Sequence, residues 1–277
     1  IYEADGKTKA DYDNLKGKKL MSLGRQGKQM WFVLSGNISL LFHFGMTGSF
    51  VIKGEKIPSY KSFVVDTSEM EWPPKFTKCM IRFENGKELA FCDPRRLGKI
   101  RIRGPKPETE LPISKLAPDP LQWQKGVPNE FSQSLKVITS NIKSALLDQE
   151  KVVSGVGNWV ADEVLYQSGI HPSVACSNLP DSMVTLLGQK LVDICRVACE
   201  CTCSFKSFPK EWLFHTRWGK GKVVSKDYFG NLITYDTVGG RTSAIVNTIQ
   251  KKTFNGGTSS EVATTSKYFA KKASAKR

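Results

Sequence analysis

The amino-acid sequence predicts an α+β protein with a β-rich N-terminal part and a helical C-terminal part that ends in a β-hairpin. Three observations support this class. Residues 29–103 contain short β-branched and aromatic segments, residues 128–199 place apolar residues at helical spacing, and residues 222–246 return to short strands between glycine turns. At 277 residues, the chain is long enough for one large domain or two modest ones with a hydrophobic core.

The N-terminal domain, which we assign to residues 1–103, is predicted to be a β-sandwich or a barrel. Its expected strands are QMWFVL, NISLLFHF, SFVVDT and the two arms of KCMIRFENGKELAFCD. The dipeptide Asn85-Gly86 divides the last segment, and it is the strongest short signal for a hairpin. Residues 104–127 then carry five prolines, which remove backbone donors and stop the sheet, so we predict a linker there.

The second domain is predicted to be helical over residues 128–221, with helices at 129–135, 141–148, 158–168 and 181–199. The longest of these has a continuous apolar face. A β-hairpin is expected over residues 222–250. Residues 251–277 are basic, polar and aperiodic, which is typical of a disordered tail.

Composition indicates the kind of partner. The chain has 41 Lys and Arg against 26 Asp and Glu, a net charge of +15, which favours a polyanion, and nucleic acid over a membrane. No apolar run is long enough to span a bilayer. Seven cysteines, four of them between Cys195 and Cys203, argue against a secreted disulfide framework and for a reducing compartment.

The stretch SGVGNWVADEVL, which begins at Ser154, places two glycines and Asn158 directly before a helix. Glycines permit close backbone approach, and the first amides of a helix lack internal partners and bind anions. This pattern is consistent with a phosphate seat. It is equally consistent with a tight turn between helices in which Asn158 is an ordinary N-cap.

Four motifs occur in the order HFGMTGSF, DPRRLGKI, LLDQ with the following VVSGVGNWVADEVLYQSGIHP, and GGRTSAIV. Together they resemble the formamidopyrimidine-DNA glycosylase (Fpg/Nei) family, especially its plant and fungal branch. The resemblance implies an N-terminal β-sandwich, a helix-two-turns-helix domain and a C-terminal finger. It also implies a bifunctional glycosylase and AP lyase of base-excision repair, which flips an oxidised purine out of the duplex, cuts its glycosidic bond and cleaves the backbone by elimination.

The resemblance further implies roles for individual residues. Met46, Arg95 and Leu97 match the trio that fills the space left by the flipped base, although bacterial members have phenylalanine where Leu97 stands. Without the motif match, Met46 and Leu97 would be assigned to the core, and Arg95 to a surface ion pair with Asp93.

Other positions match phosphate contacts. Lys28 corresponds to a lysine that holds the phosphate near the lesion and assists the chemistry, so it is the one predicted catalytic residue within the chain. The predicted DNA-binding set is completed by His43, Lys143, Asn158 and Arg241. Taken alone, a turn arginine or a lysine beside a strand is usually a solvated charge, and a lone histidine in an apolar stretch is usually a core residue.

We expect no metal and no cofactor. No cysteine follows Cys203, so the hairpin has no thiolates for zinc, and a zincless finger is expected. The spacing from Cys195 to Cys203 is not a paired C-x2-C, which favours buried, inert thiols.

In the resembling family the nucleophile is the amine of an N-terminal proline followed by glutamate. The sequence begins IYEADGKT and contains no such start, so we expect it to be a truncated form of an enzyme. The alternative is a catalytically silent damaged-DNA-binding protein on the same scaffold, or, more remotely, an RNA binder. The expected partner is double-stranded DNA with oxidised bases or abasic sites, bound by a monomer. The basic end KKASAKR favours a nuclear location.

Overall fold

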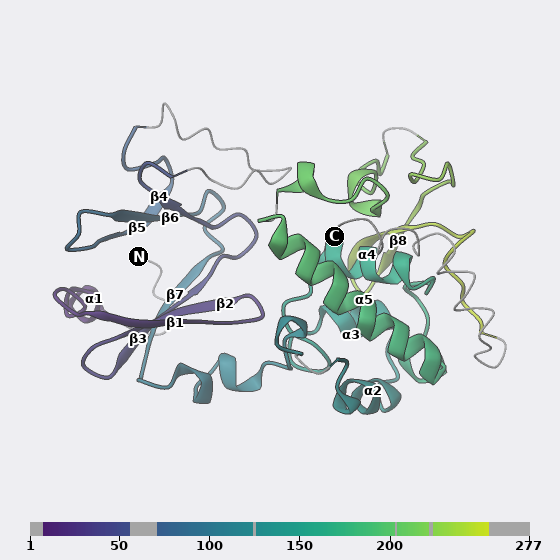
Figure 1. The fold of residues 1–277 in the computed structure, drawn as a ribbon, viewed down its shortest axis with the longest axis horizontal. Helices are drawn as coiled ribbons and strands as arrows, with labels where there is room; N and C mark the ends of the chain where they lie inside the picture. The colour runs from purple at the N-terminus through teal and green to yellow at the C-terminus, as the bar shows by residue number, and fades with distance from the viewer. Residues whose placement is uncertain (1–7, 56–70, 124–125, 203, 222–223, 255–277) are drawn as a thin grey trace, which may run out of the picture. The chain divides into compact units, whose positions relative to one another are not determined.

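The computed structural model describes residues 8–55, 71–123, 126–202, 204–221 and 224–254, and the chain divides into two compact units (Figure 1). The N-terminal unit comprises residues 1–116 with 202–205, and the helical unit comprises residues 117–201 with 206–277. The change from the first to the second falls inside the proline-rich segment predicted as a linker. The predicted strand SFVVDT lies outside the described residues.

The N-terminal unit contains two antiparallel sheets, in the orders β1-β2-β3-β7 and β4-β6-β5. Their bounds are β1 Leu20–Gln26, β2 Gln29–Leu34, β3 Ile38–His43, β4 Ser49–Ile52, β5 Thr77–Arg82, β6 Glu88–Cys92 and β7 Lys99–Arg103. Phe32, Phe42 and Ile100 of the first sheet pack against Leu89 and Phe91 of the second in one apolar core. A β-sandwich is therefore the architecture of this unit.

Several elements of this unit were not among the predicted strands: the helix α1 (Lys9–Asp13) and strands β1, β4 and β7. The first four residues of β1 are exposed, so the strand lacks the alternation of buried and exposed residues that reveals a strand in a sequence. The predicted hairpin is confirmed: Gly86 has φ +80° between the antiparallel strands β5 and β6.

The proline-rich segment contains no strand over its described residues, 104–123 and 126–127. It forms three short 3-10 turns: η1 Pro107–Thr109, η2 Ile113–Lys115 and η3 Pro120–Gln122. The loss of donors at its prolines accounts for this interruption.

The helical unit is built on α2 Asn129–Lys136, α3 Ile142–Leu147, α4 Asn158–Gln167 and α5 Asp181–Glu200, with 3-10 turns η4 Cys176–Asn178, η5 Phe205–Ser207 and η6 Leu213–His215. These bounds agree with the predicted helices to within one residue at each end. Helix α4 lies at the centre, because every residue from Val160 to Gln167 is buried. No helix in the described part of the chain has the length and apolar character needed to cross a membrane.

The C-terminal hairpin consists of β8 (Thr234–Val238) and β9 (Arg241–Ile245), joined by two glycines with φ of +61° and +70°. Ala244 packs with Val246 against Tyr166 of α4. The folded unit continues past the predicted start of the tail, because the Lys251 amide donates to the Gly169 carbonyl at 2.8 Å. Residues 255–277 lie outside the described part of the chain.

Candidate nucleic-acid interface

Met46, Arg95 and Leu97 lie on two adjacent loops of the N-terminal unit, one after β3 and one after β6. Met46 is 63% exposed and Leu97 is 44% exposed, which excludes core packing as their role. The Arg95 guanidinium donates to the Met46 sulfur at 3.4 Å. Gly45 has φ +61°, and a Cβ there would lie 2.7 Å from the Leu97 carbonyl carbon. Only glycine permits this close approach of the two loops.

Buried Asp93 holds the second of these loops in shape. Its carboxylate accepts hydrogen bonds from the Gly98 amide at 2.6 Å, the Thr47 hydroxyl at 2.8 Å and the Arg95 amide at 3.2 Å. Burial by itself would raise the pKa of Asp93, but these hydrogen bonds outweigh it and hold the pKa below its ordinary value. Asp93 therefore accepts a hydrogen bond from the main-chain amide of Arg95, and the Arg95 side chain remains exposed.

The phosphate-contact candidates Lys28 and His43 lie at one edge of the first sheet. Lys28 is exposed in the turn between β1 and β2, and His43 at the end of β3 is in register with Lys99 of β7. The pKa of His43 is lowered by burial and then by the charges of Lys28, Lys99 and Arg101. The edge thus has a positive potential. Because Lys99 directly follows the loop that carries Leu97, all five N-terminal candidates converge on one corner of the unit.

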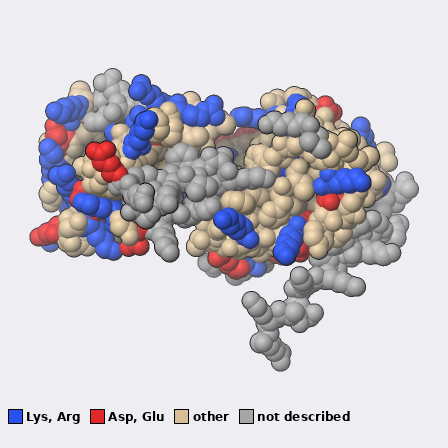
Figure 2. All heavy atoms as spheres, turned by 90° about the horizontal axis from the view of Figure 1, so that it is seen from above, with Lys and Arg blue, Asp and Glu red and all other residues tan. Residues whose placement is uncertain are grey.

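Figure 2 shows the same sign of charge on a larger scale. At the left of the view, Lys and Arg are spread over the visible face of the N-terminal unit, with smaller patches of Asp and Glu among them. Such a surface attracts the phosphates of a nucleic acid without reading its sequence.

Three predicted residues of the helical unit gather around the carbonyl oxygen of Thr242 in β9. The Asn158 side-chain amide donates to this oxygen at 3.0 Å, and the Lys143 ammonium donates to it at 3.1 Å. Arg241, which precedes Thr242, is exposed. The N-cap of α4 is Gly157, so the interpretation of Asn158 as an ordinary N-cap is wrong.

Lys143 differs from the other candidates because its side chain is fully buried. Its ammonium donates to the Asp162 carboxylate at 2.5 Å and to the Ser243 hydroxyl at 2.7 Å, in addition to the Thr242 carbonyl. These three acceptors match the three donors of an ammonium group. The expectation that Lys143 contacts DNA directly therefore does not fit the structure: the lysine joins α3 to α4 and the hairpin.

Two residues of this site were missed from the sequence, Asp162 and Arg217. Arg217, which is 8% exposed, donates to the other oxygen of the buried Asp162 carboxylate at 2.5 Å. The available signal was the pair of acids in VADEVLY, because two carboxylates inside an otherwise apolar helix require partners.

The second acid of that pair, Glu163, faces different partners. Its carboxylate accepts from the Gln167 side chain at 2.8 Å and from the Phe214 amide at 2.9 Å. Burial raises the pKa of Glu163 to about 7. Adjacent carboxylates on α4 thus contribute to separate parts of the unit.

The cysteine cluster also requires a correction. Cys195 and Cys201 are partly buried and Cys199 is exposed, so the prediction of buried thiols is wrong for Cys199. Cys203 lies outside the described residues. Within the described ranges, no group of three or more His, Cys, Asp or Glu side chains is placed to hold a metal.

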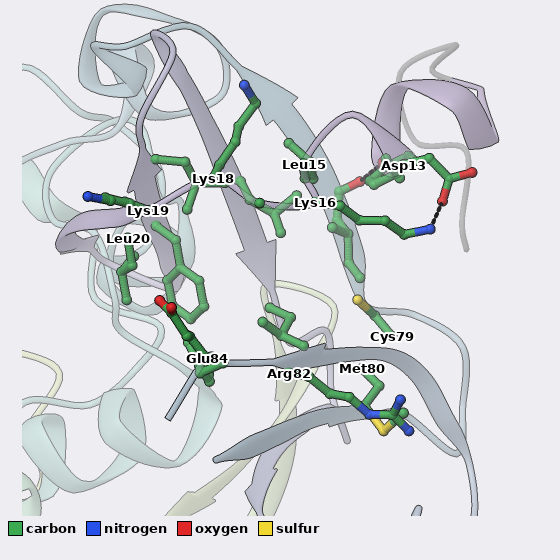
Figure 3. Close-up of a pocket in the computed structure, with 18 of the residues that line it drawn as sticks. Asp13, Leu15, Lys16, Lys18, Lys19, Leu20, Cys79, Met80, Arg82 and Glu84 are labelled. Carbon is green, nitrogen blue, oxygen red and sulfur yellow. Dashed lines mark hydrogen bonds and ion pairs between the residues drawn. The ribbon is translucent and has the colours of Figure 1, made fainter. Parts of the chain in front are cut away.

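A hollow of about 1250 Å³ opens into the N-terminal unit away from the predicted DNA-contact residues (Figure 3). It is lined by the segment between α1 and β1 and by β5, including Leu15, Lys18, Cys79 and Arg82. None of the predicted DNA-contact residues lines it. Its floor is apolar, formed in part by the sandwich core, so this hollow does not identify the functional site.

Two family models match the chain: the formamidopyrimidine-DNA glycosylase N-terminal domain over residues 3–100 and the formamidopyrimidine-DNA glycosylase H2TH domain over residues 116–208. A formamidopyrimidine-DNA glycosylase of Arabidopsis thaliana is 39% identical over 238 residues, which is 86% of this chain and 60% of that protein. One from Bacillus licheniformis is 30% identical over 67% of this chain and 62% of its own length. The chain therefore spans about three fifths of these relatives.

Solved structures agree in fold. The Lactococcus lactis Fpg in complex with DNA containing an abasic site superimposes with a TM-score of 0.68 at 23% identity, over 87% of this chain and 85% of that one. The same protein with FAPY-dG DNA gives the same TM-score at 24% identity. The predicted combination of an N-terminal sandwich and a helix-two-turns-helix domain is confirmed.

Proposed function

The chain belongs to the formamidopyrimidine-DNA glycosylase family, and from this premise we propose that it acts in base-excision repair of oxidised purines. Its partner is double-stranded DNA that contains an oxidised base or an abasic site. The observation that carries this proposal is the exposed cluster of Met46, Arg95 and Leu97 on two loops fixed by Asp93.

Base flipping explains why these side chains are exposed to solvent in the free protein. An extruded nucleotide leaves a gap in the stack, and the duplex recloses unless a group of similar size fills it. Met46 and Leu97 supply apolar volume, and the Arg95 guanidinium offers donors to the base left without a partner. Exposing two large apolar side chains costs solvation energy in the free protein, which is recovered when they enter the stack.

The remaining candidates position the backbone. Lys28 and His43 lie at the positive edge of the sandwich, and Arg241 lies at the tip of the hairpin. Phosphate contacts of this kind fix the orientation of DNA and supply most of the salt-dependent affinity. Asn158 belongs to this set through its place at the start of α4, where the helix dipole favours an anion.

The proposed chemistry is the one that the family resemblance implies, attack by the amine of an N-terminal proline on the anomeric carbon of the damaged nucleotide, which expels the base and forms a Schiff base with the opened sugar. Residues 1–277 begin with Ile1 and supply the binding groups but not this proline. Loss of the proton beside the imine carbon then expels the 3′ phosphate, which is β-elimination. Lys28 holds the neighbouring phosphate while these bonds break. Binding and extrusion are the steps that the residues described above serve.

Borohydride trapping tests this function and separates it from the alternative. The protein is incubated with an abasic-site duplex and borohydride, which reduces a Schiff base to a stable covalent adduct. An adduct supports the glycosylase and lyase, and its yield should fall in Lys28→Ala. Retained binding without an adduct favours the silent damage-binding protein. Failure to prefer lesion DNA over undamaged DNA would contradict both.

We also propose that the protein binds DNA as a monomer and resides in the nucleus. The basic end KKASAKR supports the nuclear location. A fluorescent fusion with and without residues 251–277 tests it, because loss of nuclear accumulation in the shortened form is expected.

A further inference from the structure

Asp162 stands at the centre of a buried ion cluster that joins three parts of the helical unit. One carboxylate oxygen accepts from Lys143 of α3, and the other accepts from Arg217, which follows η6. The second oxygen also accepts from the Ala244 amide of β9 at 3.3 Å. The side chain of Asp162 is 1% exposed and that of Lys143 is 0% exposed, so the charges have no water to replace a lost partner.

The cluster forms hydrogen bonds with three consecutive residues of β9. Lys143 donates to the Thr242 carbonyl and the Ser243 hydroxyl, and Asp162 accepts from the Ala244 amide. Nearer the turn, Gly239 packs so closely on α3 that an added Cβ would overlap the Ser144 hydroxyl. The Thr242 carbonyl, the Ser243 hydroxyl and the Ala244 amide are thereby bonded to side chains of α3 and α4.

The two ends of the hairpin are anchored by different forces. At the far end from the turn, apolar Ala244 and Val246 pack on Tyr166. On β9 near the turn, Arg241 is exposed and Thr242 and Ser243 are polar, so this strand contributes little apolar packing there; the buried apolar residue beside the turn is Val238 of β8. No cysteine follows Cys203, so thiolate crosslinking is also excluded within the hairpin. The ion cluster and the Asn158 amide, which also donates to the Thr242 carbonyl, hold β9 near the tip.

We propose that Asp162 is a positioning residue for lesion recognition: through Lys143 and the Ala244 amide it clamps β9 to the helices and so sets the place of Arg241. This rests on the proposed function, because Arg241 is assigned to DNA there. A clamp of this kind keeps the tip arginine pre-organised, so that DNA binding does not have to order it.

The clamp itself is tested without DNA, by amide hydrogen exchange in the free protein. Asp162→Asn keeps the shape of the side chain and removes its charge. We expect exchange of the Thr242–Ala244 amides to rise about tenfold relative to the amides of α5, because the loss of a shared partner opens this strand locally. Glu163→Gln is the matched control: it neutralises the neighbouring buried carboxylate, whose partners lie outside β9, and it should leave that ratio unchanged.

The positioning role is tested by a double-mutant cycle with Arg241→Ala, measured as affinity for a duplex with a tetrahydrofuran abasic-site analogue. Asp162→Asn should weaken binding about tenfold in the original protein and less than about twofold when Arg241 is already absent, since two residues acting as one unit are not additive. Glu163→Gln should have the same effect in both backgrounds.

The outcomes separate the claims. Unchanged exchange in β9 overturns the clamp, and raised exchange with additive binding effects overturns the positioning role. If the original protein does not bind the duplex, the proposed function fails while the exchange result still decides the clamp. Should Asp162→Asn fail to fold, Lys143→Met serves in both arms, because it keeps the Asp162–Arg217 pair, releases the Ser243 hydroxyl and leaves the Thr242 carbonyl with only the Asn158 amide as a side-chain donor.

Discussion

A buried aspartate organises each of the two candidate regions, and the two aspartates do so in opposite ways. Asp93 of the N-terminal unit binds two main-chain amides and a hydroxyl, and the arginine beside it stays exposed. Asp162 of the helical unit binds an ammonium and a guanidinium, and both cations are buried with it. The first arrangement leaves a cation exposed at the surface, and the second uses cations to join elements inside the unit.

This difference shows why residue type alone does not identify a DNA contact. Arg95 and Lys143 are both basic residues, and both were predicted to contact DNA. What separates them is the acceptor that each finds in the folded chain. The Asp93 carboxylate is stabilised by two amides and a hydroxyl and does not depend on a nearby arginine, whereas a carboxylate inside an apolar helix needs cationic or other donors to be buried.

The largest effect expected from this comparison is on stability. Asp162→Ala should lower the free energy of unfolding by about 3–5 kcal/mol, because it leaves two buried cations without their carboxylate. Urea denaturation measures it. Asp181→Ala is the control, since Asp181 pairs with Lys136 in solvent and should change stability by less than about 1 kcal/mol. Equal losses in the free energy of unfolding of the two variants would show that the Asp162 carboxylate does not stabilise the buried cluster.

The pH dependence of stability gives the next largest effect. The pKa of Glu163 is raised to about 7 by burial, so its protonated form is favoured in the folded protein. Its contribution is fully present below the unfolded pKa near 4.5 and is lost as pH rises through about 7, a decrease of about 3 kcal/mol. Thermal unfolding between pH 4.5 and 8 should therefore show a steeper decline in the original protein than in Glu163→Gln. Parallel curves would contradict the raised pKa.

Much of this contrast was predictable in outline. The four helices of the helical unit and the hairpin at Asn85-Gly86 follow from apolar periodicity and turn chemistry, which are local. The convergence of His43 with the loop of Leu97 is not local, because it depends on the register of β3 with β7. The convergence of these residues could be predicted only because their motifs resemble those of a known family.

The ion cluster was beyond local reasoning. Asp162 meets a lysine 19 positions away, an arginine 55 away and an amide 82 away. Loops of such length close at an entropic cost that the sequence pattern does not reveal. The same limit explains why Lys143 was assigned to DNA: a lysine is almost always at the surface, and its burial follows only from the position of Asp162.

A smaller effect with the opposite pH direction is expected at Asp93. Hydrogen bonds hold its pKa below the ordinary value, so its contribution is present above the unfolded pKa near 3.8 and is lost as pH falls below it. Asp93→Asn should cost about 2 kcal/mol at neutral pH, as expected for hydrogen bonds to a charged acceptor. Melting curves from pH 3 to 7 should flatten at the acid end in this variant. An unchanged acid slope would place the stabilising charge elsewhere.

The smallest effect on stability should come from Arg95→Ala, and it sharpens the comparison most. Because the Arg95 side chain is exposed and its visible contact is a weak one to the Met46 sulfur, unfolding should change by less than about 0.5 kcal/mol. Binding to an abasic duplex should be spared, whereas binding to a duplex with a paired oxidised base should weaken, since only the latter must be pried open. Arg96→Ala, the exposed neighbour, should leave the ratio of the two affinities unchanged. Equal losses of affinity for both duplexes would show that Arg95 is a general electrostatic contact. The hydrogen bonds of Asp93 to this loop would then not serve lesion recognition.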